Sequence, residues 1–205
     1  MIVVLDYGMG NVGSIMNMLK KIGARAKIAF DTETIDSADK LILPGVGAFD
    51  KGMELLEEKG FVDAIKRNVI EESKPLLGIC LGMQMLGRKS EEGKKLGLNL
   101  IPFDNIKFRI DNSFGLKIPH MGWDYIDICN QNSPLVENIG NNQRYYFVHT
   151  YHAVCDNKQD ILMESNYGYS FTAAVQHNNI YGTQFHPEKS HNFGMKLLSN
   201  FAKEC

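Results

Sequence analysis

The sequence lacks the features of a membrane-spanning, secreted or nucleic-acid-binding protein. Its longest apolar runs are far shorter than the roughly 20 residues that cross a bilayer. Lysine and arginine form no cluster, and the formal net charge is −2 over 205 residues, so we expect neither membrane nor nucleic acid as a partner. No positively charged segment precedes the first apolar residues, and we therefore expect no signal peptide.

Cysteine is scarce, and its four positions form no C-x-x-C pair. A chain of this length can bury a core large enough to fold without disulfide bonds. We therefore expect reduced thiols and a cytoplasmic protein in which most of the cysteines are incidental. The sequence also lacks internal repeats and long linkers rich in proline, glycine or serine, which predicts a single domain over residues 1–205. The cysteines are Cys80, Cys129, Cys155 and Cys205.

The first half of the chain alternates apolar strands with amphipathic helices. Ile2–Leu5 is a continuous apolar run, as expected for a strand that is buried on both faces. The alternation predicts an α/β fold, with an open, mostly parallel sheet flanked by helices. The predicted strands are Ile2–Leu5, Ala26–Phe30, Lys40–Leu43 and Leu76–Ile79; the predicted helices are one capped by Asn11 and ending near Ile22, Asp50–Glu58 and Val62–Glu72.

After about Asn105 the pattern changes to short strands separated by turn residues. These predict mainly antiparallel additions in the C-terminal half, on the same sheet or beside it. A last helix is predicted from about Ser190, because apolar residues recur there at helical spacing. The predicted strands are Ile106–Ile110, Trp123–Ile128, Arg144–His149, Ile161–Glu164, Thr172–Gln176 and Ile180–Gln184.

The stretch Pro75–Gln84 combines a short apolar strand, a sharp turn and the start of a helix. Gly78 and Gly82 flank Cys80 at i−2 and i+2, which is the nucleophile-elbow pattern with cysteine in place of serine. A side chain at either glycine would crowd the turn. The turn would hold the sulfur near a helix N-terminus, where a thiolate is stabilised. The alternative interpretation is a buried structural cysteine at a strand end.

A second segment, Gly182–Ser190, contains the other groups that a nucleophilic cysteine needs. His186 and Glu188 are two residues apart, and Pro187 biases His186 towards extended backbone, which places both side chains on one face. The carboxylate can then orient the imidazole, which can take a proton from Cys80 and return it to a leaving amine. A His-x-Glu pair alone is a weak signal, but together with Cys80 it predicts a Cys-His-Glu triad.

Two sets of backbone N–H groups could stabilise an oxyanion at this site. One is the N–H of Leu81, directly after the cysteine. The other is the loop Gly45–Gly47, whose glycines let the backbone approach a substrate closely. The alternative interpretation of that loop is a plain turn after a strand.

A glycine-rich motif near the N-terminus predicts a different function. Gly8–Gly13 matches G-x-G-x-x-G, and Asp31 lies at about the distance of a ribose-binding acid, so a nucleotide-binding module is one alternative. Against it, Asp6 and Tyr7 separate the strand from the first glycine, where the fingerprint normally turns at once. The other interpretation is a glycine-rich loop at the carboxyl edge of a parallel sheet.

No metal or cofactor site is predicted from the histidines. His149 and His152 are three residues apart, so on a strand they would point to opposite faces, and no cysteine or carboxylate accompanies them at ligand spacing. For His120, His177 and His191 we expect structural or exposed roles.

Together these motifs resemble the class I glutamine amidotransferases, which use a Cys-His-Glu triad on a flavodoxin-like α/β fold. Within that family the chain is similar to the glutaminase subunits of imidazole glycerol phosphate synthases, which act in histidine biosynthesis. Val46 indicates this group, since other members usually have Pro-Gly-Gly at the third strand. The resemblance rests on Gly78–Gln84 and Gln184–Ser190, and also on Asp6–Asn11, Pro44–Phe49, Pro119–Trp123 and Tyr146–Tyr151.

The resemblance implies a role for each group of residues and no cofactor or metal. Cys80 would attack the side-chain amide of L-glutamine, with His186 as base and then acid, held by Glu188. The oxyanion would be bound by backbone N–H groups of Val46, Gly47 and Leu81. The glutamine pocket would be lined by Gly47, Gln84, His149, Thr150 and Tyr151. The partner interface would contain Asn11, Met121, Trp123 and Lys189.

The resemblance also implies a partner, a separate (β/α)8-barrel cyclase subunit that forms a heterodimer with this chain and receives the ammonia. The isolated chain is then expected to be nearly inactive, because Val46 would need a partner-induced rearrangement. Two alternatives stay open: a paralogue that supplies ammonia to a sugar amidotransferase of surface-glycan synthesis, and a cysteine hydrolase that works alone. Trp123 also has a second interpretation, as a core residue.

Overall fold

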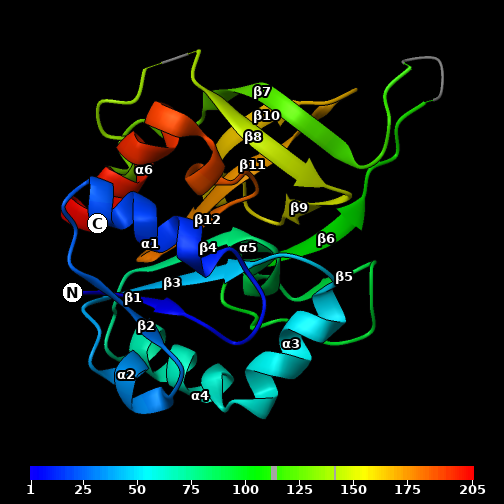
Figure 1. The fold of residues 1–205 in the computed structure, drawn as a ribbon. Coiled ribbons are helices and arrows are strands. Elements are labelled where there is room, and N and C mark those ends of the chain that lie inside the picture. The colour runs from blue at the N-terminus through cyan, green and yellow to red at the C-terminus, as the bar shows by residue number, and fades with distance from the viewer. Residues whose placement is uncertain (112–114, 141) are drawn as a thin grey trace.

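Five parallel strands form the buried half of the sheet (Figure 1). The structure is a computed structural model and describes residues 1–111, 115–140 and 142–205. β1 pairs with β2 and β3, β4 pairs with β3 and β12, and every one of these pairings is parallel. The strands are β1 (Ile2–Leu5), β2 (Ala26–Ala29), β3 (Lys40–Gly45), β4 (Leu76–Cys80) and β12 (Ile180–Thr183).

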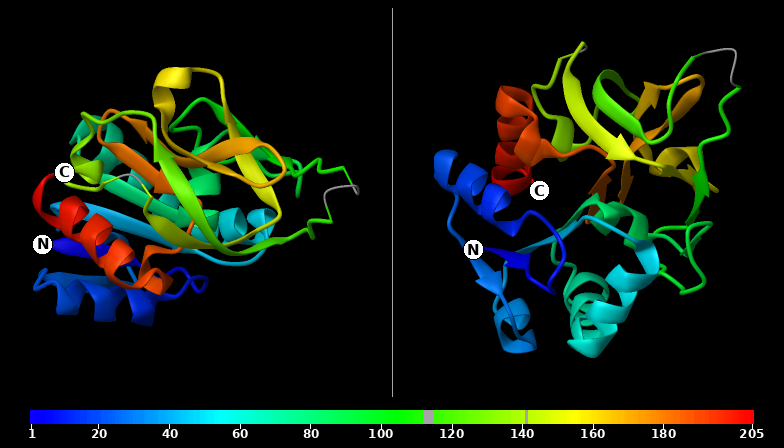
Figure 2. Two further views of the ribbon diagram at one scale, coloured as in Figure 1. Left: turned by 90° about the horizontal axis from the view of Figure 1, so that it is seen from above. Right: turned by 45° about the vertical axis from the view of Figure 1, so that its right-hand side comes forward.

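Helices cover both faces of these parallel strands, as the alternating pattern predicts. Figure 2 shows α1 and α6 side by side on one face. The short helices α2, α3, α4 and α5 lie on the other face, and α4 continues into a π-helical turn, η1. The helices are α1 (Val12–Lys21), α2 (Thr32–Asp36), α3 (Phe49–Glu58), α4 (Phe61–Lys66), η1 (Arg67–Glu71), α5 (Leu81–Leu86) and α6 (His191–Lys203).

The C-terminal half adds antiparallel strands to the same sheet. Within the described residues the sheet is 12-stranded, with the order β2-β1-β3-β4-β12-β11-β10-β7-β8 and with β5, β6 and β9 branching from it. This arrangement confirms the predicted α/β fold with antiparallel additions. The added strands are β5 (Lys89–Ser90), β6 (Phe103–Lys107), β7 (His120–Ile128), β8 (Arg144–His149), β9 (Tyr151–Cys155), β10 (Ile161–Asn166) and β11 (Ser170–His177).

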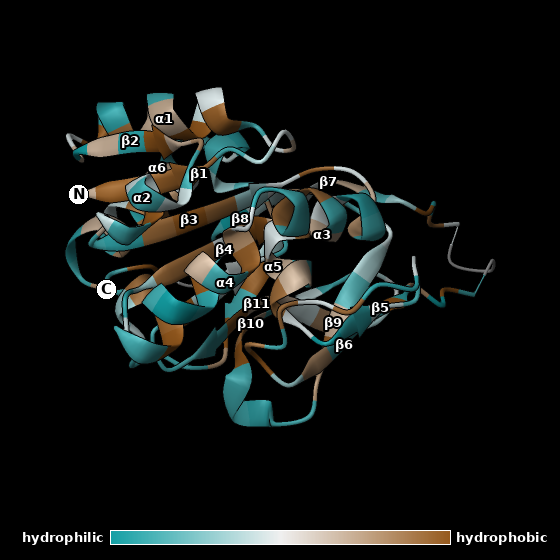
Figure 3. Ribbon diagram, turned by 90° about the horizontal axis from the view of Figure 1, so that it is seen from below, coloured by the Kyte–Doolittle hydropathy of each residue, from teal (hydrophilic) through white to brown (hydrophobic). Residues whose placement is uncertain are grey.

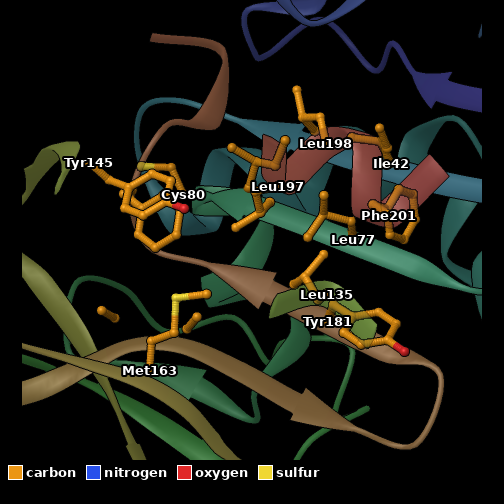
Figure 4. Packing of buried hydrophobic residues seen from close by; sticks show 14 of the residues in the cluster. Ile42, Leu77, Cys80, Leu135, Tyr145, Met163, Tyr181, Leu197, Leu198 and Phe201 are labelled. Carbon is orange, nitrogen blue, oxygen red and sulfur yellow. The ribbon is translucent and has the colours of Figure 1, made fainter. Parts of the chain in front are cut away.

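The sheet separates two hydrophobic cores. Ile2 and Val4 of β1 belong to the core beneath α1 and α6, whereas Val3 and Leu5 belong to the core of the opposite face. Because successive side chains of a strand alternate between faces, a strand buried on both sides must be apolar throughout. Figure 3 shows the result, with apolar strands inside and hydrophilic outer surfaces on the helices. Figure 4 shows side chains of α6 packed beside Leu77 of β4.

Several elements differ from the sequence-based expectation. β6 begins three residues before the predicted Ile106, and β7 begins at His120 rather than Trp123. Among the α-helices and strands, α2, β5 and β9 were not predicted, and neither were the 3-10 turns at Pro134–Val136, Lys158–Asp160 and Pro187–Lys189. α2 has five residues, too few for a helical period to show. β9 follows β8 after a single residue, Thr150, and the chain changes its pairing partners there without a glycine or proline to signal it.

The two termini lie at the same end of the molecule, away from the carboxyl ends of the parallel strands (Figure 2). The N-terminal ammonium pairs with Asp39, and Lys40 binds the carbonyl oxygens of Phe201 and Ala202 at the end of α6. No helix in the described ranges is long and apolar enough to cross a membrane.

Replacing Leu197 by alanine should lower the free energy of unfolding by about 2–5 kcal/mol, because its buried side chain would leave a cavity between α6 and the sheet. Urea denaturation followed by circular dichroism measures this loss. The exposed Lys196 is the matched control on the same helix, and Lys196→Ala should stay within about 0.5 kcal/mol of the parent. Equal effects of the two substitutions would contradict the packing described here.

Candidate active site

The chain turns sharply at Cys80, where β4 ends and α5 begins. Cys80 has φ 54° and ψ −108°, which is an unfavourable backbone conformation for any residue other than glycine. Its side chain is 7% exposed. The surrounding structure must therefore hold the cysteine in place, at the N-terminus of a helix.

Two glycines allow this turn to pack. A Cβ atom at Gly82 would overlap the carbonyl oxygen of Leu43 in β3, and one at Gly78 would lie 2.8 Å from the carbonyl oxygen of Gly82. These contacts confirm the prediction that a side chain at either glycine would crowd the elbow. The close approach also brings the elbow against the end of β3, where the loop with Val46 and Gly47 begins.

His186 and Glu188 follow β12, the strand next to β4. His186 Nδ1 is 2.8 Å from Glu188 Oε1, and the side chains are each 1% exposed. The backbone N–H of His186 donates to the carbonyl oxygen of Tyr146 at 2.9 Å, and the hydroxyl of Ser190 donates to the carbonyl oxygen of His186 at 2.6 Å. These bonds fix the imidazole in one orientation, with Nδ1 towards the carboxylate.

The other ring nitrogen of His186, Nε2, is buried and has no hydrogen-bond partner among the described residues. Burial by itself lowers the pKa of His186, but the interactions with Cys80 and Glu188 outweigh it and raise that pKa to about 10. The imidazolium form is therefore favoured at neutral pH. An imidazolium beside the sulfur stabilises the thiolate, which is the nucleophilic form of cysteine.

A cavity of about 300 Å³ opens beside the Cys80 sulfur. Its lining contains Cys80, His186 and every residue that the resemblance assigned to oxyanion binding and to the glutamine pocket, and Glu188 lies behind His186. Glu92, Pro119 and Val148 also line it and were not predicted. The predicted lining residues are Val46, Gly47, Cys80, Leu81, Gln84, His149, Thr150, Tyr151 and His186.

Two buried amides connect the cavity wall to the sulfur. Gln84 Nε2 donates to the carbonyl oxygen of Tyr151 at 3.0 Å and to Gln184 Oε1 at 3.1 Å. Gln184 Nε2 in turn points at Cys80 Sγ at 3.8 Å. Because a carbonyl oxygen can only accept, the Tyr151 carbonyl fixes the orientation of both amides. Gln184 was not predicted as a site residue, since nothing in the sequence indicates its contact with Gln84.

Glu92 reaches the cavity from a loop that is bound to the start of α3. Its Oε2 accepts the N–H of Phe49 at 2.9 Å, and Asp50 accepts the N–H groups of Lys94 and Lys95 at 2.9–3.0 Å. The two segments therefore hold each other at the rim of the cavity. The sequence shows only an acidic residue in a loop, and its place at the site depends on this tertiary contact.

Comparison with known proteins identifies the family. The family model described as glutamine amidotransferase class-I matches residues 3–205. The chain belongs to the class-I glutamine amidotransferases. It is 54% identical over 205 residues to "Imidazole glycerol phosphate synthase subunit HisH 2" of Methanococcus maripaludis, covering 100% of each chain. It is 50% identical over 204 residues to the protein of the same name from Pseudomonas aeruginosa, covering 99% of each.

Solved structures share the fold at low sequence identity. "Structure of PurLQS from Thermotoga maritima" aligns with a TM-score of 0.75 and 19% identity, covering 98% of this chain and 96% of that one. The glutaminase domain of Trypanosoma brucei CTPS aligns with a TM-score of 0.68 and 16% identity, covering 98% and 93%. These two likenesses concern the fold alone.

The amidotransferase exposes most of the residues predicted for a partner interface. Met121 is 62% and Trp123 37% exposed, so the core interpretation of Trp123 is wrong. The Trp123 ring stacks on His191 with centroids 5.4 Å apart, and Lys189 Nζ lies 5.8 Å from the centroid of Tyr146, which also contacts Trp123. Asn11 has a structural role as well, because its Oδ1 accepts the N–H of Ser14 and caps α1. Their role at an interface stays a prediction.

The positions of two histidines differ from expectation. His149 and His152 do not face opposite sides, because the strand breaks at Thr150; both rings lie near Phe108, with centroids 5.2 and 4.7 Å away. His120 bonds to His149, and His177 Nδ1 lies 2.8 Å from Asp160 Oδ1. In the described residues no group of three or more His, Cys, Asp or Glu side chains could hold a metal ion.

The glycine-rich motif Gly8–Gly13 has structural partners in this amidotransferase. Asp31, which would be the ribose-binding acid of a dinucleotide site, accepts the N–H of Thr34 at 2.7 Å and caps α2. Tyr7 donates its hydroxyl to the carbonyl oxygen of Pro44 at 2.7 Å and so joins the loop to the end of β3. Residues 8–11 of the motif are a loop at the carboxyl edge of the sheet, and Val12 and Gly13 begin α1.

Replacing Cys80 by alanine should lower the pKa of His186 well below about 10, because an interaction that favours the imidazolium is lost while its burial remains. Nitrogen-15 NMR of the imidazole ring measures the titration directly. Cys129→Ala is the matched control, since that cysteine is exposed, and should leave the His186 titration unchanged. An unchanged titration in Cys80→Ala would contradict the coupling between thiol and imidazole.

Proposed function

We propose that this amidotransferase is the glutaminase subunit of an imidazole glycerol phosphate synthase and supplies ammonia from L-glutamine for histidine biosynthesis. The observation that carries the proposal is the convergence of Cys80 and His186 at one small cavity, with Glu188 bonded to His186 from behind. Full-length relatives named as subunits of that synthase, at 54% and 50% identity, support the choice of pathway.

Cys80, His186 and Glu188 have the arrangement that nucleophilic hydrolysis of an amide needs. The Cys80 thiolate attacks the side-chain amide carbon of glutamine, and the imidazolium of His186 gives its proton to the leaving nitrogen, so that ammonia departs and a thioester forms. His186 then removes a proton from water, which attacks the thioester and releases glutamate and the cysteine. Glu188 keeps the ring orientation and stabilises its charged form throughout.

The cavity offers partners for the charged and polar parts of glutamine. The backbone N–H of Leu81 and the Val46–Gly47 loop lie at the sulfur, where the oxyanion of the tetrahedral intermediate would form. Glu92 is an acidic side chain in the lining and fits the α-ammonium group of the substrate. Gln84 uses both N–H groups within the protein, so its Oε1 is left for the substrate.

The ammonia acceptor is a separate subunit in this proposal. We infer a (β/α)8-barrel cyclase that forms a heterodimer with this chain in the cytoplasm and covers the surface with Met121, Trp123, Lys189 and Asn11. Exposed aromatic and sulfur-containing side chains such as Trp123 and Met121 favour a protein interface. Val46 is 40% exposed beside the cavity, where a docking partner could change the backbone of the oxyanion loop.

Cys80→Ala should abolish glutamine hydrolysis by the chain together with its synthase partner, because the nucleophile is lost. Glutamate release measured in a coupled assay tests this, with Cys129→Ala as the active control. Glutaminase activity retained by Cys80→Ala would refute the triad.

The partner is tested by adding, in turn, a barrel cyclase and a sugar amidotransferase from the same organism. We expect the cyclase with its ribotide ligand to stimulate hydrolysis and the lone chain to be nearly inactive. Stimulation by the sugar amidotransferase alone would assign the chain to surface-glycan synthesis, and high turnover without any partner would indicate an independent hydrolase.

Glu92→Gln should raise the KM for glutamine about tenfold or more with a smaller effect on kcat, because a charged hydrogen bond to the α-ammonium group is lost. Steady-state glutaminase kinetics of the complex measures both constants. Glu91→Gln is the matched control, since Glu91 binds Arg109 and the N–H of Lys107 outside the cavity. Equal KM values for Glu92→Gln and the parent would show that Glu92 does not bind the α-ammonium group of glutamine.

A further inference from the structure

A chain of hydrogen bonds links Asp124, on the strand with the exposed Met121 and Trp123, to the wall of the cavity. Asp124 Oδ2 lies 2.6 Å from His120 Nε2, and His120 Nδ1 lies 3.1 Å from His149 Nε2. His149 Nδ1 lies 2.8 Å from the carbonyl oxygen of Tyr151. The Asp124 side chain is 37% exposed, whereas His120 is fully buried. We name Asp124, His120 and His149 the histidine relay.

Counting hydrogens shows that the histidine relay needs one proton more than its neutral rings carry. The Tyr151 carbonyl only accepts, so the hydrogen of a neutral His149 must be on Nδ1, and Nε2 must accept from His120. The hydrogen of a neutral His120 must then be on Nδ1. Its Nε2 consequently carries no hydrogen, although it lies 2.6 Å from the Asp124 carboxylate. A hydrogen can lie in each of the three contacts only if the relay binds one extra proton. The three side chains together then have a net charge of zero, because this proton balances the Asp124 carboxylate.

Two aromatic rings that flank His120 would stabilise such a proton. Its ring is stacked between Phe147 and Tyr167, with centroids 4.9 and 4.0 Å away and interplanar angles of 21° and 20°. The faces of aromatic rings attract a cation. The extra positive charge therefore has a carboxylate at one edge and an aromatic ring on each side.

Other titratable groups face the relay from neighbouring elements. They are His152 on β9, His186 after β12, and Tyr167 and Tyr169 between β10 and β11; Glu91 acts on His152 from the loop after β5. Burial lowers the pKa of His120, and the Asp124 carboxylate opposes it; burial likewise lowers the pKa of His149. The extra proton is thus lost as the pH rises, and one of the three contacts must then open.

The far end of the relay controls the orientation of a glutamine-pocket residue. The Tyr151 carbonyl that accepts from His149 also accepts from Gln84 Nε2 at 3.0 Å. Gln84 continues the chain through Gln184 to Cys80 Sγ. A shift of His149 would therefore move the carbonyl that holds both amides.

We propose that Asp124 and His120 are positioning residues for glutamine binding, and that the proton they share with His149 holds Tyr151 and Gln84 in the orientation that accepts the substrate. The proposal rests on the proposed glutaminase function. Neither residue touches the reacting atoms, so the effect falls on KM for glutamine rather than on kcat.

Asp124→Asn is the sharpest test, because its side-chain amide can donate to a neutral His120 and complete all three contacts without the extra proton. Glutaminase kinetics of the chain with its synthase partner would be measured from pH 5.5 to 8.5. We expect KM of the parent to rise about fivefold with pH, the effect of one lost hydrogen bond, and KM of Asp124→Asn to stay level. The ratio of the two kcat values should not change with pH.

Asp127→Asn is the matched control, since it removes the same charge from an exposed position of the same strand and should keep the pH dependence of the parent. The same KM profile in Asp124→Asn and the parent would overturn the proposal, and so would loss of the pH dependence in Asp127→Asn.

A second readout does not depend on activity. Nitrogen-15 NMR of the free chain should show His120 changing from charged to neutral with rising pH in the parent and staying neutral in Asp124→Asn. A His120 that is neutral throughout in the parent would overturn the relay even if glutamine is hydrolysed. Absence of hydrolysis with every synthase, together with a titrating His120, would instead refute the proposed function and leave the relay in place.

Discussion

The close approach of the β4–α5 turn to the end of β3 is the constraint on which the rest of the site depends. Gly82 lies so near the Leu43 carbonyl that no Cβ atom fits, and Cys80 has a positive φ in the same turn. A left-handed conformation is costly for cysteine, so packing on both faces of the sheet has to supply the compensation. The two cores, one beneath α1 and α6 and one beneath α2 to α5, do so. The sulfur lies next to the loop with Val46 and Gly47 and at the helix N-terminus.

The site lies where the parallel and antiparallel halves of the sheet meet. Cys80, Val46 and His186 come from the ends of parallel strands, whose carboxyl ends gather at one edge. The opposite wall, with Val148 to Tyr151, comes from β8 and β9 of the antiparallel half. The proposed nucleophile and its proposed base therefore belong to the part shared by open α/β folds, whereas the wall that shapes the pocket belongs to the added strands.

The orientation of the buried polar groups around the sulfur is set by a carbonyl oxygen, which can accept hydrogen bonds but cannot donate them. The Tyr151 carbonyl determines which end of the Gln84 amide is the donor, and Gln84 determines the same for Gln184. The same carbonyl determines the tautomer of His149 and so imposes a proton count on His120 and Asp124. An unpaired donor or acceptor in a low-dielectric interior is strongly destabilising. One backbone oxygen therefore fixes which groups donate and which accept along a chain of hydrogen bonds from strand β7 to Cys80.

Local patterns predict the parallel half of the fold, the elbow and the residues proposed for the triad. An apolar run such as Ile2–Leu5 and glycines at fixed offsets from Cys80 follow from short-range geometry, as does an imidazole two residues from a carboxylate. The other features of the site depend on contacts between distant parts of the chain. β9 and the meeting of His149 with His152 at Phe108 depend on a break at Thr150 that carries no turn signal, and Trp123 is exposed although a lone tryptophan fits a core equally well. Glu92, Gln184 and Asp124 reach the site through contacts between segments far apart in the chain, and no spacing in the sequence encodes such contacts.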